Sequence, residues 1–246
     1  MRGSRKALLI LLGVAVALFP SPAYAMHISE SILPGPWAGL WFAVSLPFVL
    51  WGLRDIQQRS REKPYTKALV GLVGAAVFIV SCMPIPVPWL GTCSHPCGTG
   101  LAAILIGPWA TVVVASIALL LQALFLAHGG LSTLGANICS MGVAGAFIGY
   151  GVFLVARRVG ASFFVAAFLA GLLSDWGTYA TTSFELASAL CGDNSPWQMF
   201  LTILVAFAPT QIPLGVAEGA VGAMACLFIH SRRPELLGNL MEGKRA

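Results

Sequence analysis

The sequence carries very little charge. Asp, Glu, Lys and Arg together make up only 9% of its 246 residues, whereas about 25% is typical of soluble domains. Hydrophobic residues make up 58%, and the mean hydropathy is +0.86. This composition excludes an ordinary soluble fold and predicts an integral membrane protein.

Several catalytic and nucleotide-binding motifs are also missing. No stretch fits G-x-x-x-x-G-K-[ST], so we do not expect the chain to hydrolyse ATP itself. The sequence has no H-E-x-x-H motif of zinc proteases and no G-x-S-x-G nucleophile elbow. Its six cysteines form no C-x-x-C pair, so a zinc ribbon or a thioredoxin-like site is not indicated.

The first 25 residues have the three parts of a secretory signal peptide. Residues 2–6 are basic, residues 7–18 form an apolar run too short to span a bilayer comfortably, and residues 23–25 form an A-x-A cleavage pattern. We expect this segment to be cleaved, which makes Met26 the N-terminal residue of the mature protein, outside the cytoplasm. The alternative is an uncleaved anchor helix.

The remaining chain, residues 26–246, is expected to form a single transmembrane domain. Its apolar stretches are residues 37–53, 67–87, 100–127, 134–156, 161–190 and 197–229. They should be helices, because lipid leaves backbone groups no partners outside helices and closed barrels, and the stretches are too long for barrel strands.

The stretch 100–127 is too long for one span. As a single helix it would measure about 42 Å, against a hydrocarbon core of about 30 Å, and Gly107-Pro108 interrupts it. We therefore expect a short piece that ends near Ile106 and a full span from Pro108 to Leu126. The predicted fold is all-α, with six full spans plus one short or re-entrant segment.

The distribution of basic residues predicts the orientation in the membrane. After residue 25, Lys and Arg occur only at residues 54–67, 157–158 and 232–245, and these clusters should be cytoplasmic. The six-span arrangement then places the mature N-terminus outside the inner (cell) membrane and the C-terminus in the cytoplasm. It also places His95 and His128 in external loops. Because all basic residues fall in such positions, the sequence pI near 9.1 does not indicate a nucleic-acid partner.

A histidine at position two of a free N-terminus is a metal chelator. The amine of Met26, the amide nitrogen between Met26 and His27, and the His27 imidazole can bind one ion in a plane with one corner open. Such tetragonal nitrogen sites suit Ni(II) and Cu(II), and these donors can also hold Co(II). His95 is the natural fourth donor, although it could equally be an ordinary loop histidine. Binding should release protons, so affinity should rise with pH.

Four long stretches resemble one known family. They are MHISESILPGPWAGLWFAVSLPFVLWGLR, GTCSHPCGTGLAAILIGPW, QALFLAHGGLSTLGANICSM and TQIPLGVAEG. They are similar to segments of the CbiM/NikM family, the substrate-capture (S) components of energy-coupling-factor (ECF) transporters for cobalt and nickel. The likeness runs from Met26 to about His230, which is nearly the whole of the expected mature chain.

The resemblance implies a helical S-component fold with the N-terminal segment tucked into the bundle. The metal ligands it implies are the amine and amide nitrogens at Met26–His27 and the imidazoles of His27 and His95. The implied function is capture of Co(II) from the extracytoplasmic side, feeding cobalamin biosynthesis, with Ni(II) as the alternative cargo and no covalently bound cofactor. The implied partners are a membrane coupling (T) subunit, cytoplasmic ATPase subunits and a small accessory membrane subunit.

Other polar residues are candidates for supporting roles. Glu30 is close in sequence to the expected metal, Ser94 precedes His95, and His128 is either a transient ligand near the entry or a loop contact. Asn137 and Gln211 lie in predicted spans, where they could hydrogen-bond between helices or orient the N-terminal segment.

Five further residues have roles that the sequence leaves open. Cys97 departs from the family pattern, in which a small polar residue such as Thr is expected. Cys93 and Cys97 bracket His95 and could close a strained disulfide, remain thiols or compete for the metal. Asp175, Glu185 and Glu218 lie in apolar spans, where ionisable groups are costly. Structural pairing, subunit contact and a metal pathway all remain possible for them.

Two other classes of function compete with metal capture. An intramembrane metal-dependent enzyme could be built on Asp175 and Glu218 or on a histidine-bound metal, but it would need a water-activating base beside an open metal position. The sequence offers no such constellation. The second alternative is a structural membrane subunit without a ligand. Only metal capture predicts that one extra residue before Met26 abolishes metal binding.

Overall fold

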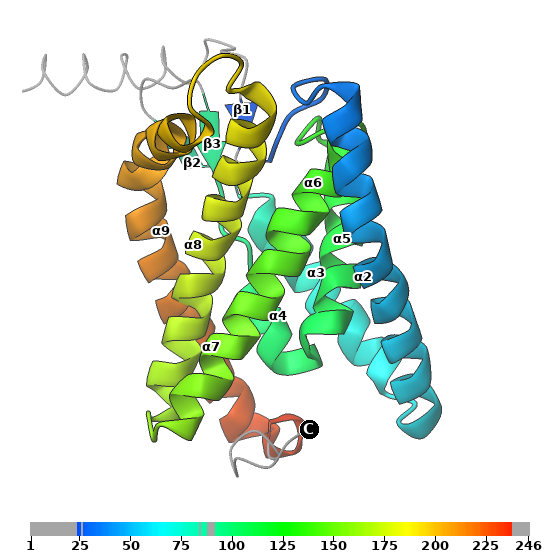
Figure 1. Ribbon diagram of the computed structural model, residues 1–246. Coiled ribbons are helices and arrows are strands. Elements are labelled where there is room, and N and C mark those ends of the chain that lie inside the picture. Colours follow the sequence, from blue (N-terminus) through cyan, green and yellow to red (C-terminus); the bar gives the residue numbers. More distant parts are fainter. Residues whose placement is uncertain (1–23, 26, 84, 88–91, 238–246) are drawn as a thin grey trace, which may run out of the picture.

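The computed structural model describes residues 24–25, 27–83, 85–87 and 92–237. Its helices lie side by side along one axis, with a small sheet at one end (Figure 1). The helical elements are α2 (Gly35–Glu62), α3 (Thr66–Ser81), α4 (Thr99–Ile106), α5 (Pro108–Phe125), α6 (Leu134–Asn137), the π-helix η1 (Ile138–Gly145), α7 (Ala146–Arg158), α8 (Phe163–Leu190), α9 (Pro196–Arg232) and the 3-10 helix η2 (Pro234–Leu236).

Five helical stretches of the described chain are long and apolar enough to cross a bilayer. They are α2, α5, the continuous run α6–η1–α7, α8 and α9, and each corresponds to a predicted span. The remaining predicted span, residues 67–87, corresponds to α3, which has only 16 residues. Its predicted end is wrong, since the helix stops at Ser81 and the chain then forms a strand. The sequence Met83-Pro84-Ile85-Pro86 explains this, because residues that precede proline disfavour the α conformation.

The predicted break inside residues 100–127 is confirmed. Helix α4 ends at Ile106, Gly107 has a φ of 81°, and α5 begins at Pro108. The Arg59 side chain, which pairs with Asp55 on α2, donates a hydrogen bond of 2.7 Å to the carbonyl of Ile106. The short segment predicted before Gly107 is thus an eight-residue helix whose last turn is capped from α2.

The all-α prediction missed a three-stranded sheet in the described part of the chain. Its order is β1 (Tyr24–Ala25), β3 (Thr92–Ser94), β2 (Ile85–Val87), with β1 parallel and β2 antiparallel to β3. The strands are only two or three residues long, too short to give a recognisable alternation of polar and apolar residues. In the unprocessed chain the sheet places residues 24–25, just before His27, next to the chain just before His95. The predicted cleavage after Ala25 would remove β1 and leave the β2–β3 pair.

Glycines let four helices approach closely in the centre of the bundle. A β-carbon on Gly171 of α8 would lie 2.9 Å from the Cα of Gly219 on α9, and one on Gly149 of α7 would lie 3.0 Å from the Cα of Gly100 on α4. Small residues at helix contacts are how helices pack tightly in lipid. The beginning of α4 is therefore fixed against α7, α8 and α9.

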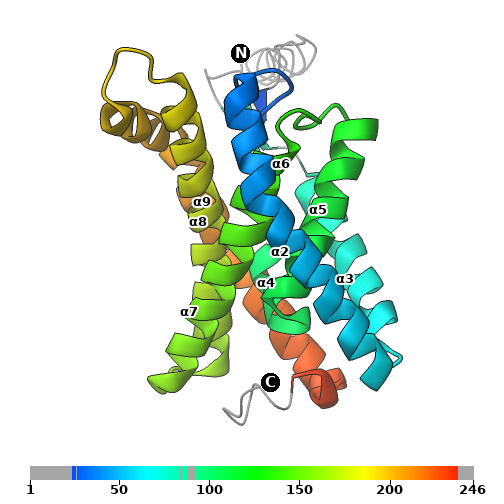
Figure 2. The same ribbon diagram turned by 45° about the vertical axis from the view of Figure 1, so that its right-hand side comes forward.

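The two ends of the bundle differ in charge. The last turns of α2, α7 and α9 carry basic residues, and the ribbons of these three helices end opposite the sheet in both views (Figures 1 and 2). The basic residues of the described chain at the ends of α2, α7 and α9 therefore share one end of the bundle, as the topology predicted from the sequence requires.

Candidate metal centre

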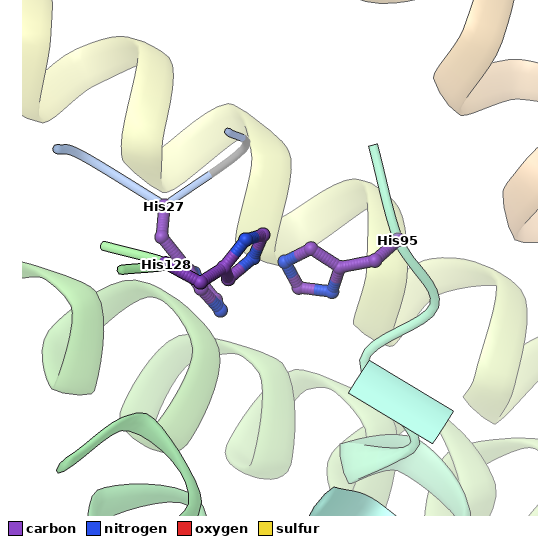
Figure 3. A group of neighbouring side chains, drawn as sticks. All are labelled: His27, His95 and His128. Carbon is purple, nitrogen blue, oxygen red and sulfur yellow. The ribbon is translucent and has the colours of Figure 1, made fainter. Parts of the chain in front are cut away.

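Three histidine side chains meet at the sheet end of the bundle. The ring centroids of His27 and His95 are 4.3 Å apart, and that of His128 lies 5.0 Å from each. One ring nitrogen from each residue lies within 4.8 Å of the other two, and the three rings point toward one another (Figure 3). We call His27, His95 and His128 the histidine cluster.

Three separate connecting segments supply these side chains. His27 follows β1, His95 follows β3, and His128 follows α5. His27 and His95 are buried, and His128 is partly buried. In the described structure, the Nε2 atoms of all three have no hydrogen-bond partner. Buried polar atoms without partners are costly, so these nitrogens are suited to bind an ion.

The surroundings of His95 determine which of its two ring nitrogens can bind a metal ion. Its Nδ1 lies 3.1 Å from the carbonyl oxygen of Pro96. A carbonyl only accepts hydrogen bonds, so in the neutral ring Nδ1 carries the proton and Nε2 holds the free electron pair. A hydrogen bond of this kind orients metal-binding histidines in proteins. The Nε2 of His95 is the atom presented to the cluster.

The histidine cluster is held neutral by its environment. Burial, followed by the charges of His95 and His128, lowers the pKa of His27 well below its usual value, and the nearby Gln122 amide partly offsets this. Burial and then His128 lower the pKa of His95 to about 3. Burial also lowers the pKa of His128. Neutral imidazole is the form that binds metals, so no proton must be removed from these three rings at neutral pH.

Asn137 holds the N-terminal segment in place. Its side-chain oxygen accepts the backbone N–H of Ile28 at 2.8 Å, and its amide nitrogen donates to the carbonyl of the same residue at 3.1 Å. The hydroxyl of Thr133 donates to that carbonyl as well. Asn137 ends α6 immediately before the π-helix η1, and π-helical turns often occur at functional sites. These bonds fix the residue next to His27.

The loop after α5 also holds the N-terminal segment. The Glu30 carboxylate accepts the backbone N–H of Ser132 at 3.1 Å, and the backbone N–H of Ser31 donates to the Ser132 hydroxyl. The hydrogen bonds from Ser132 lower the pKa of Glu30. A β-carbon on Gly130 would lie 2.5 Å from the Cα of Glu30, so only glycine allows this approach. The segment that carries His27 is thereby pressed onto the loop that carries His128.

Helix α9 positions His95 through hydrogen bonds to the residues before and after it. Before His95, the Ser94 hydroxyl accepts a hydrogen bond of 2.8 Å from the Gln211 amide and lies 3.2 Å from the Thr210 hydroxyl. After His95, the Glu218 carboxylate accepts the backbone N–H groups of Cys97 and Gly98 at 2.7 and 2.8 Å. Residues 94–98 are therefore fastened to one helix at two points.

The structure brings most of the predicted site residues together. His27 and His95 form one cluster with His128, while Glu30, Ser94, Asn137 and Gln211 each hold a segment that carries a histidine. Met26 lies outside the described residues. Sequence reasoning missed Thr133 and Ser132, whose only signal was their position after the His128-Gly-Gly turn.

The structure shows the surroundings of Cys97, Asp175, Glu185 and Glu218, whose roles the sequence left open. Cys97 is a free thiol, buried with Asp175 and Glu218, while the side chain of Cys93 lies outside the described part. Glu218 has the structural role given above. Glu185 is buried in α8, and its two carboxylate oxygens lack partners among the described residues.

The fold and the histidine cluster define a class: a multi-helix membrane protein in which three imidazoles converge, the kind of nitrogen donor that late first-row transition metals prefer. A sequence profile of the family described as cobalt uptake substrate-specific transmembrane region, CbiM, matches residues 27–236. The chain belongs to this family.

Relatives and solved structures extend this result. The chain is 58% identical over 227 residues to the cobalt transport protein CbiM of Geobacter sulfurreducens, covering 92% of this chain and 66% of that one. It is 56% identical to the protein of the same name from Sorangium cellulosum, covering 87% and 96%. A crystal structure of a truncated transition metal transporter shares the fold, with a TM-score of 0.72 at 22% identity, over 84% of this chain and 99% of that chain.

Proposed function

We propose that this protein captures Co(II) from the extracytoplasmic side of the membrane as the substrate-binding subunit of an ECF-type importer. The observation that carries the proposal is the convergence of three imidazoles, those of His27 and His95 buried and that of His128 partly buried, each with a ring nitrogen within 4.8 Å of the other two. The relatives are named as cobalt transport proteins, which supports both transport as the function and cobalt as the metal. Hydrolysis of ATP is assigned to separate partner subunits.

The complete ligand set in this proposal includes the mature N-terminus. Cleavage after Ala25 would free the amine of Met26, one residue before His27. The amine, the amide nitrogen and the Nδ1 of His27 and the Nε2 of His95 then supply four nitrogens, and His128 is a further donor close to both rings. The two hydrogen bonds between the Asn137 side chain and the backbone of Ile28 support this proposal, because they hold the residue after His27 at both its N–H and its carbonyl.

The proposed orientation places the histidine cluster outside the cytoplasm. It is supported by the position of the basic turns at the opposite end of the bundle, which the positive-inside rule assigns to the cytoplasm. In that orientation the coupling subunit and the ATPases act at the basic end. The imported cobalt would serve cobalamin biosynthesis.

Nickel is the competing cargo. Imidazole and amide nitrogens suit Ni(II) as well as Co(II), and the intrinsic affinity order places Ni(II) above Co(II). The histidine cluster by itself therefore accepts both ions, and the preference for cobalt rests on the names of the relatives. A cell or vesicle assay of the whole transporter is needed to separate the two.

Two measurements test the proposal. Isothermal titration of the purified, processed protein with Co(II) should give tight binding that His95→Ala weakens more than about 100-fold, because even residues outside the ligand set cost about 10- to 100-fold. His230→Ala is the matched control, since His230 lies in the last turn of α9 at the basic end. Uptake of labelled Co(II) and Ni(II) by cells that express the chain with its partner subunits then identifies the cargo.

Each result has a clear consequence. Equal weakening by both histidine variants would contradict the proposed site. Uptake of Ni(II) with no uptake of Co(II) would replace cobalt by nickel. Tight binding without uptake of either ion by the complete system would contradict the transport role.

A further inference from the structure

A second group of metal-binding side chains lies next to the histidine cluster. The Cys97 thiol, the Asp175 carboxylate and the Glu218 carboxylate each offer one atom, and these atoms all lie within 4.8 Å of one another. All three residues are buried. We call Cys97, Asp175 and Glu218 the cysteine–carboxylate cluster.

Asp175 is the residue that points to a ligand. Its side chain is 0% exposed, and it faces into the cluster, with Oδ1 3.9 Å from the Cys97 Sγ. Its Oδ2 has no hydrogen-bond partner in the described structure. A buried carboxylate without a partner is costly, and buried charges in proteins are normally paired or bound to metals.

No cationic side chain neutralises this group in the described residues. The ion pairs found there are Arg59–Asp55 and Arg233–Glu235, both at the basic end of the bundle. Two carboxyl groups and a thiol therefore share a buried space that lacks a counter-charge. A bound cation would supply it.

Glu218 can serve this cation and hold the loop at the same time. Each of its carboxylate oxygens accepts one backbone N–H, from Cys97 and Gly98. An ionised carboxylate has about four acceptor positions, so two remain free. The same two bonds place the backbone of Cys97 against α9 and direct its thiol toward Asp175.

We propose that the cysteine–carboxylate cluster is a second binding site for a transition metal ion. One sulfur and two carboxylate donors suit Co(II) or Zn(II), whereas Mg(II) and Ca(II) prefer oxygen alone. Asp175 and Glu218 lie near the middle of α8 and α9, and Cys97 is two residues beyond His95. If the proposed function holds, this site is where an ion from the histidine cluster can move next into the bundle.

Cobalt absorption tests the second site separately from the first. Purified, processed protein is titrated with CoCl2 while absorption is recorded in the near ultraviolet, where a thiolate bound to Co(II) gives a charge-transfer band and imidazole does not. The wild type should show the band and bind two ions per chain. Cys97→Ser should lose the band and bind one, and Asp175→Asn should weaken the band-forming step by at least about 10-fold.

Matched variants make the result specific. Cys226→Ser replaces another buried cysteine, on α9, and should keep the band unchanged. His27→Ala should also keep the band, while it removes the binding of Co(II) at the histidine cluster. Failure of the proposed function and failure of this inference therefore give different results. Monodisperse elution on size exclusion checks that each variant is folded.

Three outcomes would overturn the second site. The first is a band that persists in Cys97→Ser. The second is a band that Cys226→Ser abolishes as well. The third is a folded Asp175→Asn protein that binds Co(II) at this step as tightly as the wild type.

Discussion

The histidine cluster and the cysteine–carboxylate cluster are neighbours built in different ways. The first takes its side chains from three connecting segments, and its donors are neutral imidazoles. The second takes two of its three side chains from the middle of α8 and α9, and its donors are acidic or sulfur groups. The connecting segments place their imidazoles at the sheet end of the bundle, whereas α8 and α9 place their carboxylates in its interior.

The two clusters share one short piece of chain. Residues 94–98 carry His95 to one cluster and Cys97 to the other, and α9 fastens this piece at Ser94 and at the N–H groups of residues 97 and 98. A movement of α9 would therefore change both clusters together. The predictions below test whether a substitution affects one cluster or both, from the largest expected effect to the smallest.

The largest expected effect comes from His27→Ala. It removes a ligand from the histidine cluster and should weaken Co(II) binding there by more than about 100-fold, beyond the cost of losing an indirect contact. The near-ultraviolet band of the second cluster should remain. Isothermal titration and absorption measured on the same sample check both statements. Loss of both signals in a folded protein would mean that the clusters are not separate sites.

Glu218→Gln should disturb both clusters at once. The amide keeps the shape of the side chain, but it has only one acceptor oxygen and no charge, so it can accept only one of the N–H groups of residues 97 and 98. Binding at the histidine cluster should fall by about 10-fold, and binding at the cysteine–carboxylate cluster, where Glu218 is also a proposed donor, should fall further. Glu185→Gln is the matched control, because Glu185 is also buried and no hydrogen bond from residues 94–98 reaches it. Titration with Co(II) measures both variants. Equal effects from the two changes would contradict the role given to Glu218.

Asn137→Ala should affect the histidine cluster alone. It removes both side-chain hydrogen bonds to Ile28, each worth about 1 kcal/mol, so Co(II) binding at the histidine cluster should weaken by up to about 30-fold. Ser140→Ala is the control, since the Ser140 hydroxyl donates only to backbone carbonyls of its own helix. Titration with the near-ultraviolet band as a second readout separates the clusters. A reduced band in Asn137→Ala would show that the N-terminal segment also supports the second cluster.

The smallest expected effect is on the stability of the metal-free protein at acid pH. The pKa of His95 falls from 6.5 to about 3 on folding, so the unfolded state binds more protons between these values. Stability contributed by the neutral ring is therefore present above pH 6.5 and is lost progressively as the pH falls toward 3. Thermal unfolding in detergent should show a lower Tm at pH 5 than at pH 7. His95→Gln, which cannot take up a proton, should reduce this difference, and an unchanged difference would contradict the assignment.

The sequence predicted those parts of the fold that depend on long apolar runs and strong breakers. The spans and the interruption at Gly107-Pro108 followed from length and from the conformations that proline allows. The end of α3 and the small sheet did not, because strands of two or three residues leave no periodic signal. The sheet joins β3 to the nearby β2 and also to β1, which lies far earlier in the chain.

The same contrast holds for the site. His27 and His95 could be named from the position of one after an A-x-A pattern and the place of the other in a glycine-rich external loop. The convergence of His128 with them could not be derived, since it depends on how the loop after α5 folds over Glu30. Asp175 and Glu218 stood out as acids in apolar spans, but only the packing of α8 against α9 brings them to Cys97.

The most direct test of the account concerns the bond between Ala25 and Met26. A variant with one alanine inserted between the cleavage pattern and Met26 should be processed to a mature chain that begins one residue earlier, as mass spectrometry can verify. Its Met26 nitrogen would then be an amide, and His27 would stand at position three. The account predicts that isothermal titration finds tight Co(II) binding in the normal mature protein and its loss in the extended one. Equally tight binding by both proteins that His95→Ala weakens to the same extent in each would contradict the N-terminal chelate.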